Sequence, residues 1–246
     1  MKLLLLGTGG YHPTETRHTA CLMLPEVGVV LDSGTGMFRV AAHLLTDELD
    51  IFITHAHLDH VVGLTYLLGL LHGRELARVT VHGAETKLAA VRQHLFADEL
   101  FPVPPRFELR PLTAEVSLPL GGQLSWFPLV HPGGSVGYRL QWPGRSMAYV
   151  TDTTAEPDAG YIENIRGVDL LVHECNYSDD QAEAAKAQGH GSISAVAEVA
   201  RSAGVGRLIL THIDPKLTGS DPLNLSVAQR IFPATEVGHD RMEVEF

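Results

Sequence analysis

The stretch D-I-F-I-T-H-A-H-L-D-H occupies residues 50–60 and places four potential metal ligands within six residues. Residues 50–54 predict an apolar strand and residues 60–71 are apolar with helical spacing, so the ligands fall on a strand-to-helix turn. In an extended segment residues i and i+2 point the same way, so His55 and His57 could hold one metal. Asp59 and His60, after the turn, could face a second. The simpler alternative is a chance group of histidines at a helix start, with Asp59 as its N-cap.

Three more ligand-capable residues each follow an apolar strand. His131 follows S-W-F-P-L-V, Asp152 follows M-A-Y-V-T, and His212 follows R-L-I-L-T. The carboxyl ends of strands are where sites of α/β proteins usually form. Taken singly, His131 could be a turn residue, Asp152 a cap and His212 an edge histidine. Together with the first motif they predict two divalent metal ions, for which imidazole and carboxylate ligands favour zinc, with manganese or iron as alternatives.

The rest of the chain predicts a mixed order of strands and helices. Short strands separated by Pro and Gly fill residues 106–150, and strand–helix alternation occupies both ends. A plain parallel sheet would not need the central run, so we expect two packed sheets with helices outside. No linker divides the chain, and we predict one domain over residues 1–246. The predicted strands cover residues 2–6, 20–24, 28–32, 50–54, 77–82, 106–110, 115–118, 123–129, 136–142, 146–150, 168–174 and 206–210, and the predicted helices 37–45, 60–71, 84–96, 179–187, 192–203 and 223–231.

The amino-acid composition disfavours long nucleic acid as a partner. The formal net charge is −11, whereas a protein that binds long nucleic acid needs many Lys and Arg residues to contact the phosphates. Cys21 and Cys175 lie in apolar surroundings outside any C-x-x-C motif, which favours buried free thiols over a disulfide or metal ligands. No stretch approaches 18 apolar residues, so no membrane span is expected and the cytoplasm is the expected compartment.

The ligand pattern resembles that of the metallo-β-lactamase superfamily. H-A-H-L-D-H at 55–60 and three isolated ligands carry this resemblance, and L-L-L-L-G-T-G-G at 3–10 and V-V-L-D-S-G-T-G at 29–36 are similar to it too. The resemblance covers nearly the whole chain and implies a four-layer αββα sandwich, which is an α/β fold. It also implies one metal held by His55, His57 and His131, a second held by Asp59, His60 and His212, and Asp152 as the bridging ligand.

A finer resemblance is to the ribonuclease Z branch, through residues 7–18, H-E-C-N at 173–176 and G-H-G-S at 189–192. It implies that His190 protonates the leaving oxygen or binds the phosphate, with Glu174 near it. Asp59 would be the third catalytic residue, orienting the attacking hydroxide and accepting its proton. Arg17 would join His190 in substrate binding. The simpler interpretations make His190 a helix cap, Arg17 a surface loop residue, and His173 with Glu174 mere supports of the ligands.

The short segment 131–152 leaves no room for the extended arm that tRNA-binding members of this branch usually carry between these two ligands. It resembles instead the phosphoribosyl cyclic-phosphate phosphodiesterases, although their extra cysteine-based zinc site is not recognisable here. We therefore favour a phosphodiesterase that cleaves a small or cyclic phosphodiester by metal-bound hydroxide attack. The alternatives are a tRNA 3′-processing endonuclease, a carboxyl-ester, thioester or lactone hydrolase on the same scaffold, and a non-catalytic scaffolding protein. RNA is the less favoured partner, and a homodimer stays open.

Overall fold

The computed structural model describes residues 1–70, 72 and 76–246, which divide into two compact units. The first unit comprises Met1–Thr113 and Asp240–Glu245, and the second comprises Ala114–His239 and Phe246. Each unit is built on its own seven-stranded sheet. The prediction of one domain over residues 1–246 stays a prediction, because compactness alone does not show whether the units fold separately.

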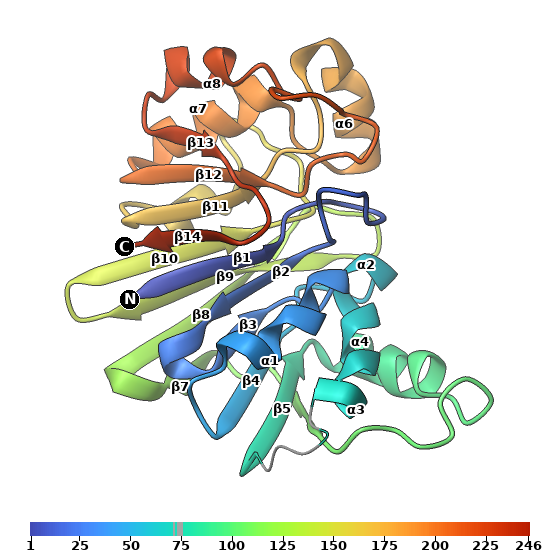
Figure 1. Cartoon of the computed structure of the whole chain (residues 1–246). Coiled ribbons are helices and arrows are strands. Elements are labelled where there is room, and N and C mark those ends of the chain that lie inside the picture. The colour runs from blue at the N-terminus through green and yellow to red at the C-terminus, as the bar shows by residue number, and fades with distance from the viewer. Residues whose placement is uncertain (71, 73–75) are drawn as a thin grey trace. The chain divides into compact units, whose positions relative to one another are not determined.

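The first unit holds a mixed sheet in the order β14-β1-β2-β3-β4-β5-β6. Its neighbours from β14 to β3 pair antiparallel, and those from β3 to β6 pair parallel. Short helices lie together along β3 to β5 (Figure 1). The strands are β1 (Lys2–Gly7), β2 (Cys21–Leu24), β3 (Val29–Leu31), β4 (Glu48–Phe52), β5 (Arg78–Gly83), β6 (Glu108–Pro111) and β14 (Met242–Glu245). The helices are α1 (Val40–His43), α2 (Leu58–Val61), α3 (Leu67–Leu70) and α4 (Glu85–Ala90), with 3-10 turns at Pro25–Val27, Thr35–Arg39 and Val62–Tyr66 and a π turn at Val91–Leu95.

The two faces of this sheet differ in chemistry. Leu49 and Ile51 of β4 pack against Val61 and Leu64 of the helical segments in one apolar core. Successive strand residues point to opposite faces, so Asp50 lies on the other face. There its carboxylate accepts hydrogen bonds from Arg78 and from His82, at 2.9 and 2.8 Å. Burial works to raise the pKa of Asp50, but the bonds from His82 and Arg78 outweigh it and the pKa is lowered.

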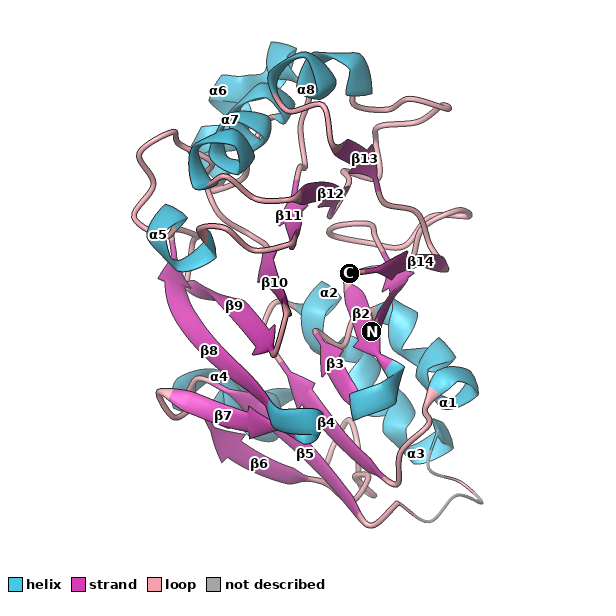
Figure 2. Ribbon diagram, turned by 90° about the vertical axis from the view of Figure 1, so that its left-hand side faces the viewer, coloured by secondary structure: helices cyan, strands magenta, loops and turns pink. Residues whose placement is uncertain are grey.

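The second unit repeats the mixed plan in the order β13-β12-β11-β10-β9-β8-β7. Neighbours from β7 to β10 are antiparallel and those from β10 to β13 are parallel. Helices α6, α7 and α8 gather beside β11 to β13 (Figure 2). The strands are β7 (Glu115–Leu118), β8 (Gly122–Leu129), β9 (Ser135–Trp142), β10 (Arg145–Val150), β11 (Leu170–Glu174), β12 (Arg207–Thr211) and β13 (Thr235–Val237). The helices are α5 (Ile162–Ile165), α6 (Ala182–Gln188), α7 (Ile193–Ala203) and α8 (Leu225–Ile231), with 3-10 turns at Pro119–Gly121 and Asp179–Gln181.

The structure confirms the predicted strands and shortens several predicted helices. The helix expected over residues 60–71 begins earlier, at Leu58, and a 3-10 turn at Val62–Tyr66 interrupts it; residue 71 lies outside the described residues. A Cβ on Gly63 would come within 2.2 Å of the Gly34 carbonyl oxygen, so the chain packs too closely there for a larger side chain. The helix expected at 37–45 is a 3-10 turn followed by α1, which ends at His43. Within the described ranges, none of the helices combines the length and apolar character that a bilayer crossing requires.

Candidate metal centre

The first unit gathers four of the predicted ligands on the turn between β4 and α2. The His55 ring centroid lies 4.4 Å from that of His57 and 4.3 Å from that of His60. The Nε2 atom of His60 is 3.4 Å from an Asp59 carboxylate oxygen. His55 and His60 are buried, whereas His57, the residue before α2, is exposed. The loop after β4 therefore carries two imidazoles, and the first turn of α2 adds a carboxylate and a third imidazole.

A buried carboxylate outside the predicted set orients one of these ligands. Asp32 follows β3, and its carboxylate accepts hydrogen bonds from the Thr54 N–H and from Nδ1 of His60, both at 2.8 Å. Because the Nδ1 proton is used in this bond, Nε2 of His60 keeps its lone pair for a metal. Asp32 was part of the V-V-L-D-S-G-T-G resemblance, yet only the parallel pairing of β3 with β4 shows which ligand it supports.

The second unit gathers the other three predicted ligands around one carboxylate. An oxygen of Asp152 lies 3.6 Å from Nε2 of His131, and its other oxygen lies 3.4 Å from Nε2 of His212. Asp152 and His212 both have positive φ angles, 53° and 56°, which are costly for residues other than glycine. A carboxylate that turns one oxygen toward each of two imidazoles has the form of a bridging metal ligand.

The two imidazoles around Asp152 are also held at their Nδ1 atoms. Nδ1 of His131 donates to the Gly189 carbonyl at 3.0 Å. The Asn176 side-chain amide lies 3.1 Å from Nδ1 of His212 and donates to the His212 carbonyl at 3.0 Å. Burial lowers the pKa of His131 although the nearby Asp152 carboxylate opposes it, and so favours the neutral imidazole that binds metals. Asn176 lies in the H-E-C-N stretch at 173–176, where no local pattern indicates its contact with His212.

Glu174 and His190 form a hydrogen-bonded pair in the same unit. The fully buried Glu174 carboxylate accepts a 2.9 Å hydrogen bond from Nδ1 of His190 and a 3.0 Å bond from the Thr153 N–H. Burial works to raise the pKa of Glu174, but attraction to His190 and the hydrogen bond from it lower the pKa overall. The ligand-capable atoms of Asp152, His190 and His212 lie within 4.8 Å of one another. His190 therefore stands beside the predicted ligands, with one ring nitrogen fixed and the other turned away from Glu174.

His173 and Arg17 make contacts of another kind. Nδ1 of His173 donates to the Glu174 carbonyl at 2.7 Å, and its Nε2 accepts from the Tyr161 hydroxyl at 2.9 Å. Burial lowers the pKa of this fully buried ring, so that it is held neutral inside the fold. The Arg17 guanidinium, in the first unit, donates to the Thr8 hydroxyl at 2.6 Å within loop 7–18. His173 thus braces the strand that carries Glu174, and Arg17 braces its own loop.

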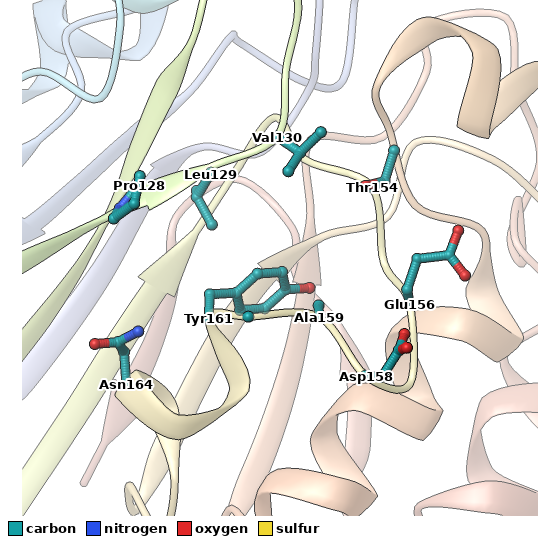
Figure 3. A pocket seen from close by; sticks show the side chains of 10 residues that line it. Pro128, Leu129, Val130, Thr154, Glu156, Asp158, Ala159, Tyr161 and Asn164 are labelled. Atoms are coloured by element: carbon teal, nitrogen blue, oxygen red, sulfur yellow. The ribbon is translucent and has the colours of Figure 1, made fainter.

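A pocket of about 470 Å³ opens in the second unit beside the ends of β8 and β10 (Figure 3). Val130, which directly precedes His131, and Thr154 line it together with the Tyr161 ring. The carboxylates of Glu156 and Asp158 lie on one side of that ring in Figure 3. Pockets of this size hold small ligands, and the two carboxylates disfavour an anionic group inside this one.

The donors of each unit fit a divalent cation. Each set combines imidazoles with carboxylate, and two of the imidazoles, His60 and His131, have an acceptor at Nδ1 that leaves Nε2 as the ligand atom. The structure thus brings together the predicted ligands of each unit and adds Asp32 and Asn176 as their supports. The sequence-based expectation that the chain can bind divalent metal agrees with this chemistry.

Known proteins resemble the chain over its full length. Residues 29–213 match a family model described as the beta-lactamase superfamily domain. The ribonuclease Z of Methanosarcina acetivorans is 27% identical over 302 aligned residues, which cover 100% of this chain and 98% of the relative. Among solved structures, the metallo-beta-lactamase fold protein YhfI from Bacillus subtilis has a TM-score of 0.81 at 16% identity and covers 99% of each chain. A diphosphatase from the PhnP family has a TM-score of 0.75 at 21% identity, covering 100% of this chain and 97% of its own.

These likenesses confirm the predicted family, the predicted four-layer αββα fold and the expected class of enzyme, a metal-dependent hydrolase. The family predicted from the short motifs is therefore correct. The chain belongs to the beta-lactamase superfamily and has the metallo-β-lactamase fold.

Proposed function

We propose that the chain is a dinuclear metal-dependent phosphodiesterase that acts on a small or cyclic phosphodiester. Zinc is the expected ion, with manganese or iron as alternatives. The ligands would be His55, His57, Asp59, His60, His131, Asp152 and His212.

The buried Glu174–His190 pair is the observation that carries this proposal. Cleavage of a phosphodiester expels an alkoxide, which needs a proton in order to leave. Glu174 fixes Nδ1 of His190, so the proton that can be given away is the one on Nε2. An enzyme that cleaves only activated esters or lactones would have less use for such an acid.

The remaining steps fall to Asp59 and to the bound ions. Two divalent cations would acidify a water molecule and polarise the phosphoryl oxygen. Asp59 would orient the attacking water and accept its proton. One of its oxygens accepts a 2.9 Å hydrogen bond from the Tyr11 N–H, which holds the carboxylate in position. Arg17 and His190 would contact the phosphate, where a positive charge stabilises the developing anion.

Precursor tRNA is the second candidate substrate, because the relative from Methanosarcina acetivorans is named ribonuclease Z. Two observations favour a smaller substrate. Strands β9 and β10 fill the segment between His131 and Asp152, so no arm extends from it. The net charge of −11 also gives little attraction for the phosphates of a long RNA.

The test combines metal analysis with a substrate panel. The proposal expects about two metal ions per chain and faster turnover of bis-p-nitrophenyl phosphate and cyclic nucleotides than of p-nitrophenyl acetate, a homoserine lactone or precursor tRNA. A His190→Gln variant should lose about 10²- to 10⁴-fold in kcat on an alkyl phosphodiester, but much less on the p-nitrophenyl ester, whose leaving group needs no acid. Preferred turnover of the carboxyl ester or lactone, or an equal loss on both phosphodiesters, would contradict the proposal.

A further inference from the structure

Tyr11 presents an aromatic ring to solvent directly beside a predicted catalytic residue. Its side chain is 79% exposed, and its backbone N–H donates to the Asp59 carboxylate at 2.9 Å. The ring of His12 lies 5.4 Å from the Tyr11 ring, tilted by 58°. Two neighbouring rings thus stand on the loop that holds Asp59 in place, and neither the ligand set nor the proposed chemistry uses them.

The backbone at Tyr11 is one that glycine would adopt more easily. The His12 N–H donates to the Gly10 carbonyl at 2.7 Å, which closes a three-residue turn with Tyr11 at its centre. The φ angle of Tyr11 is 60°, in the left-handed region that bulky residues rarely occupy. Such turns are strained, and strained residues cluster at functional sites. Glycine would form the same turn with less strain, so the tyrosine at this position points to a role for its side chain.

The loop that carries the ring is fixed at several points. The Gly9 N–H donates to the His18 carbonyl at 2.9 Å, and the Thr14 N–H donates to the Arg17 carbonyl at 2.8 Å. Asp240 accepts from the Thr8 N–H at 3.0 Å and ties the loop to the end of the sheet. These bonds hold the backbone of the loop in place, so the position from which the ring projects is preorganised before a ligand binds.

We propose that Tyr11 is a specificity-determining residue that stacks on a planar base of the substrate, so that the preferred phosphodiester is a nucleotide. This inference rests on the proposed phosphodiesterase function, because it places the phosphate at the Asp59 side of the loop. Stacking suits this position because an exposed ring contributes through its face and needs no hydrogen-bond code. The adjacent His12 ring is tilted by 58° and would meet the edge of such a base, so the Tyr11 ring alone provides the stacking face.

The test compares two substrates that differ only in the base, adenosine 2′,3′-cyclic phosphate and 1-O-methylribose 2,3-cyclic phosphate. The measured quantity is the ratio of their kcat/KM values. Tyr11→Asn removes the ring and keeps a residue that tolerates a positive φ, so the backbone bond to Asp59 is retained. Tyr11→Gly does the same with less strain and serves if the Asn variant does not fold. Tyr11→Phe is the matched control, since it keeps the ring and loses only the hydroxyl.

The wild type should prefer the adenosine substrate, and the ratio should fall about 5- to 100-fold in Tyr11→Asn and stay near the wild-type value in Tyr11→Phe. An unchanged ratio in the Asn and Gly variants would overturn the inference while leaving the phosphodiesterase function intact. If the wild type hydrolyses neither substrate, the proposed function fails, and binding decides the role of Tyr11. Calorimetry should then show tighter binding of adenosine 5′-monophosphate than of ribose 5-phosphate, with the difference lost in Tyr11→Asn; equal binding would overturn the inference.

Discussion

Replacing Asp32 by Asn removes one acceptor oxygen from a buried carboxylate whose two oxygens both accept hydrogen bonds. Its carboxylate receives hydrogen bonds from the Thr54 N–H and hydroxyl and from Nδ1 of His60. An asparagine amide has only one acceptor oxygen, so its NH₂ group must face either Thr54 or His60. The φ angle of Asp32 is 58°, a conformation that Asn adopts readily, and the backbone should therefore be undisturbed.

Both orientations of the new amide are costly. If its NH₂ group faces His60, Nδ1 of the ring must become an acceptor, and the proton moves to Nε2, the predicted ligand atom. The affinity for one metal ion should then fall about 10- to 100-fold. If the NH₂ group faces Thr54 instead, two donors meet inside the protein, and the unfolding free energy of the metal-free chain should drop by about 1–3 kcal/mol.

Two measurements on the same variant separate these effects. Competition with a chromophoric chelator gives the metal affinities, and urea unfolding in EDTA gives the stability of the metal-free protein. Asp50→Asn is the matched control, because Asp50 also accepts from a histidine in this unit, His82, which is not a predicted ligand. It should lower stability and leave metal affinity unchanged. An Asp32→Asn protein that matches the wild type in both measurements would refute the reasoning.

Three further outcomes are expected. Asp152→Ala should lose both metal ions and activity together, whereas His131→Ala should weaken mainly one ion; metal content per chain after dialysis checks both, and an Asp152→Ala protein with two ions and full turnover would rule out the bridging role. Because the pKa of Asp50 is lowered in the folded protein, its contribution to stability is present above its ordinary pKa of about 4 and is lost as the pH falls through the lowered value. The unfolding free energy of Asp50→Asn should therefore decline less steeply with falling pH in that range than that of the wild type. An equally steep decline would contradict this. Burial raises the pKa of Cys21 and Cys175, so an aromatic disulfide reagent should label neither thiol until the chain unfolds, and rapid labelling of the native protein would show that they are accessible.

The sequence predicts the position of a candidate ligand well where that position depends on a single strand. An apolar run followed by a ligand-capable residue predicts a polar side chain at the end of a strand, and His131, Asp152 and His212 each lie directly after or near such an end. The segment 54–60 is the strongest signal for the same reason, because it places four potential ligands next to one strand. Local pattern thus predicts the candidate ligands of each unit.

The supporting residues depend on pairings between distant segments. Asp32 reaches Thr54 because β3 and β4 run parallel with Leu31 opposite Phe52. Asn176 reaches His212 because β11 and β12 pair in parallel, with Glu174 opposite Thr211. An acid or an amide near a strand end has many candidate partners in the sequence, and only the register of the sheet selects one. The break of the predicted 60–71 helix likewise involves a distant segment, because the Gly63 N–H donates to the Ser33 carbonyl at 2.7 Å and Gly63 packs against Gly34.

The residues that select a substrate are different from those that hold metal. Imidazoles and carboxylates in this arrangement would acidify water equally well for a phosphodiester, an ester or a lactone, so the ligand set cannot discriminate among them. The leaving group can, because only a poor one needs the proton that Glu174 and His190 are arranged to deliver. The organic part of the substrate can too, because Tyr11 offers it an exposed ring on the anchored loop whose backbone contacts Asp59. If both features act as argued, variants at His190 and Tyr11 should alter substrate preference while metal content stays constant, and a variant at Asp32 should weaken metal binding while substrate preference stays constant.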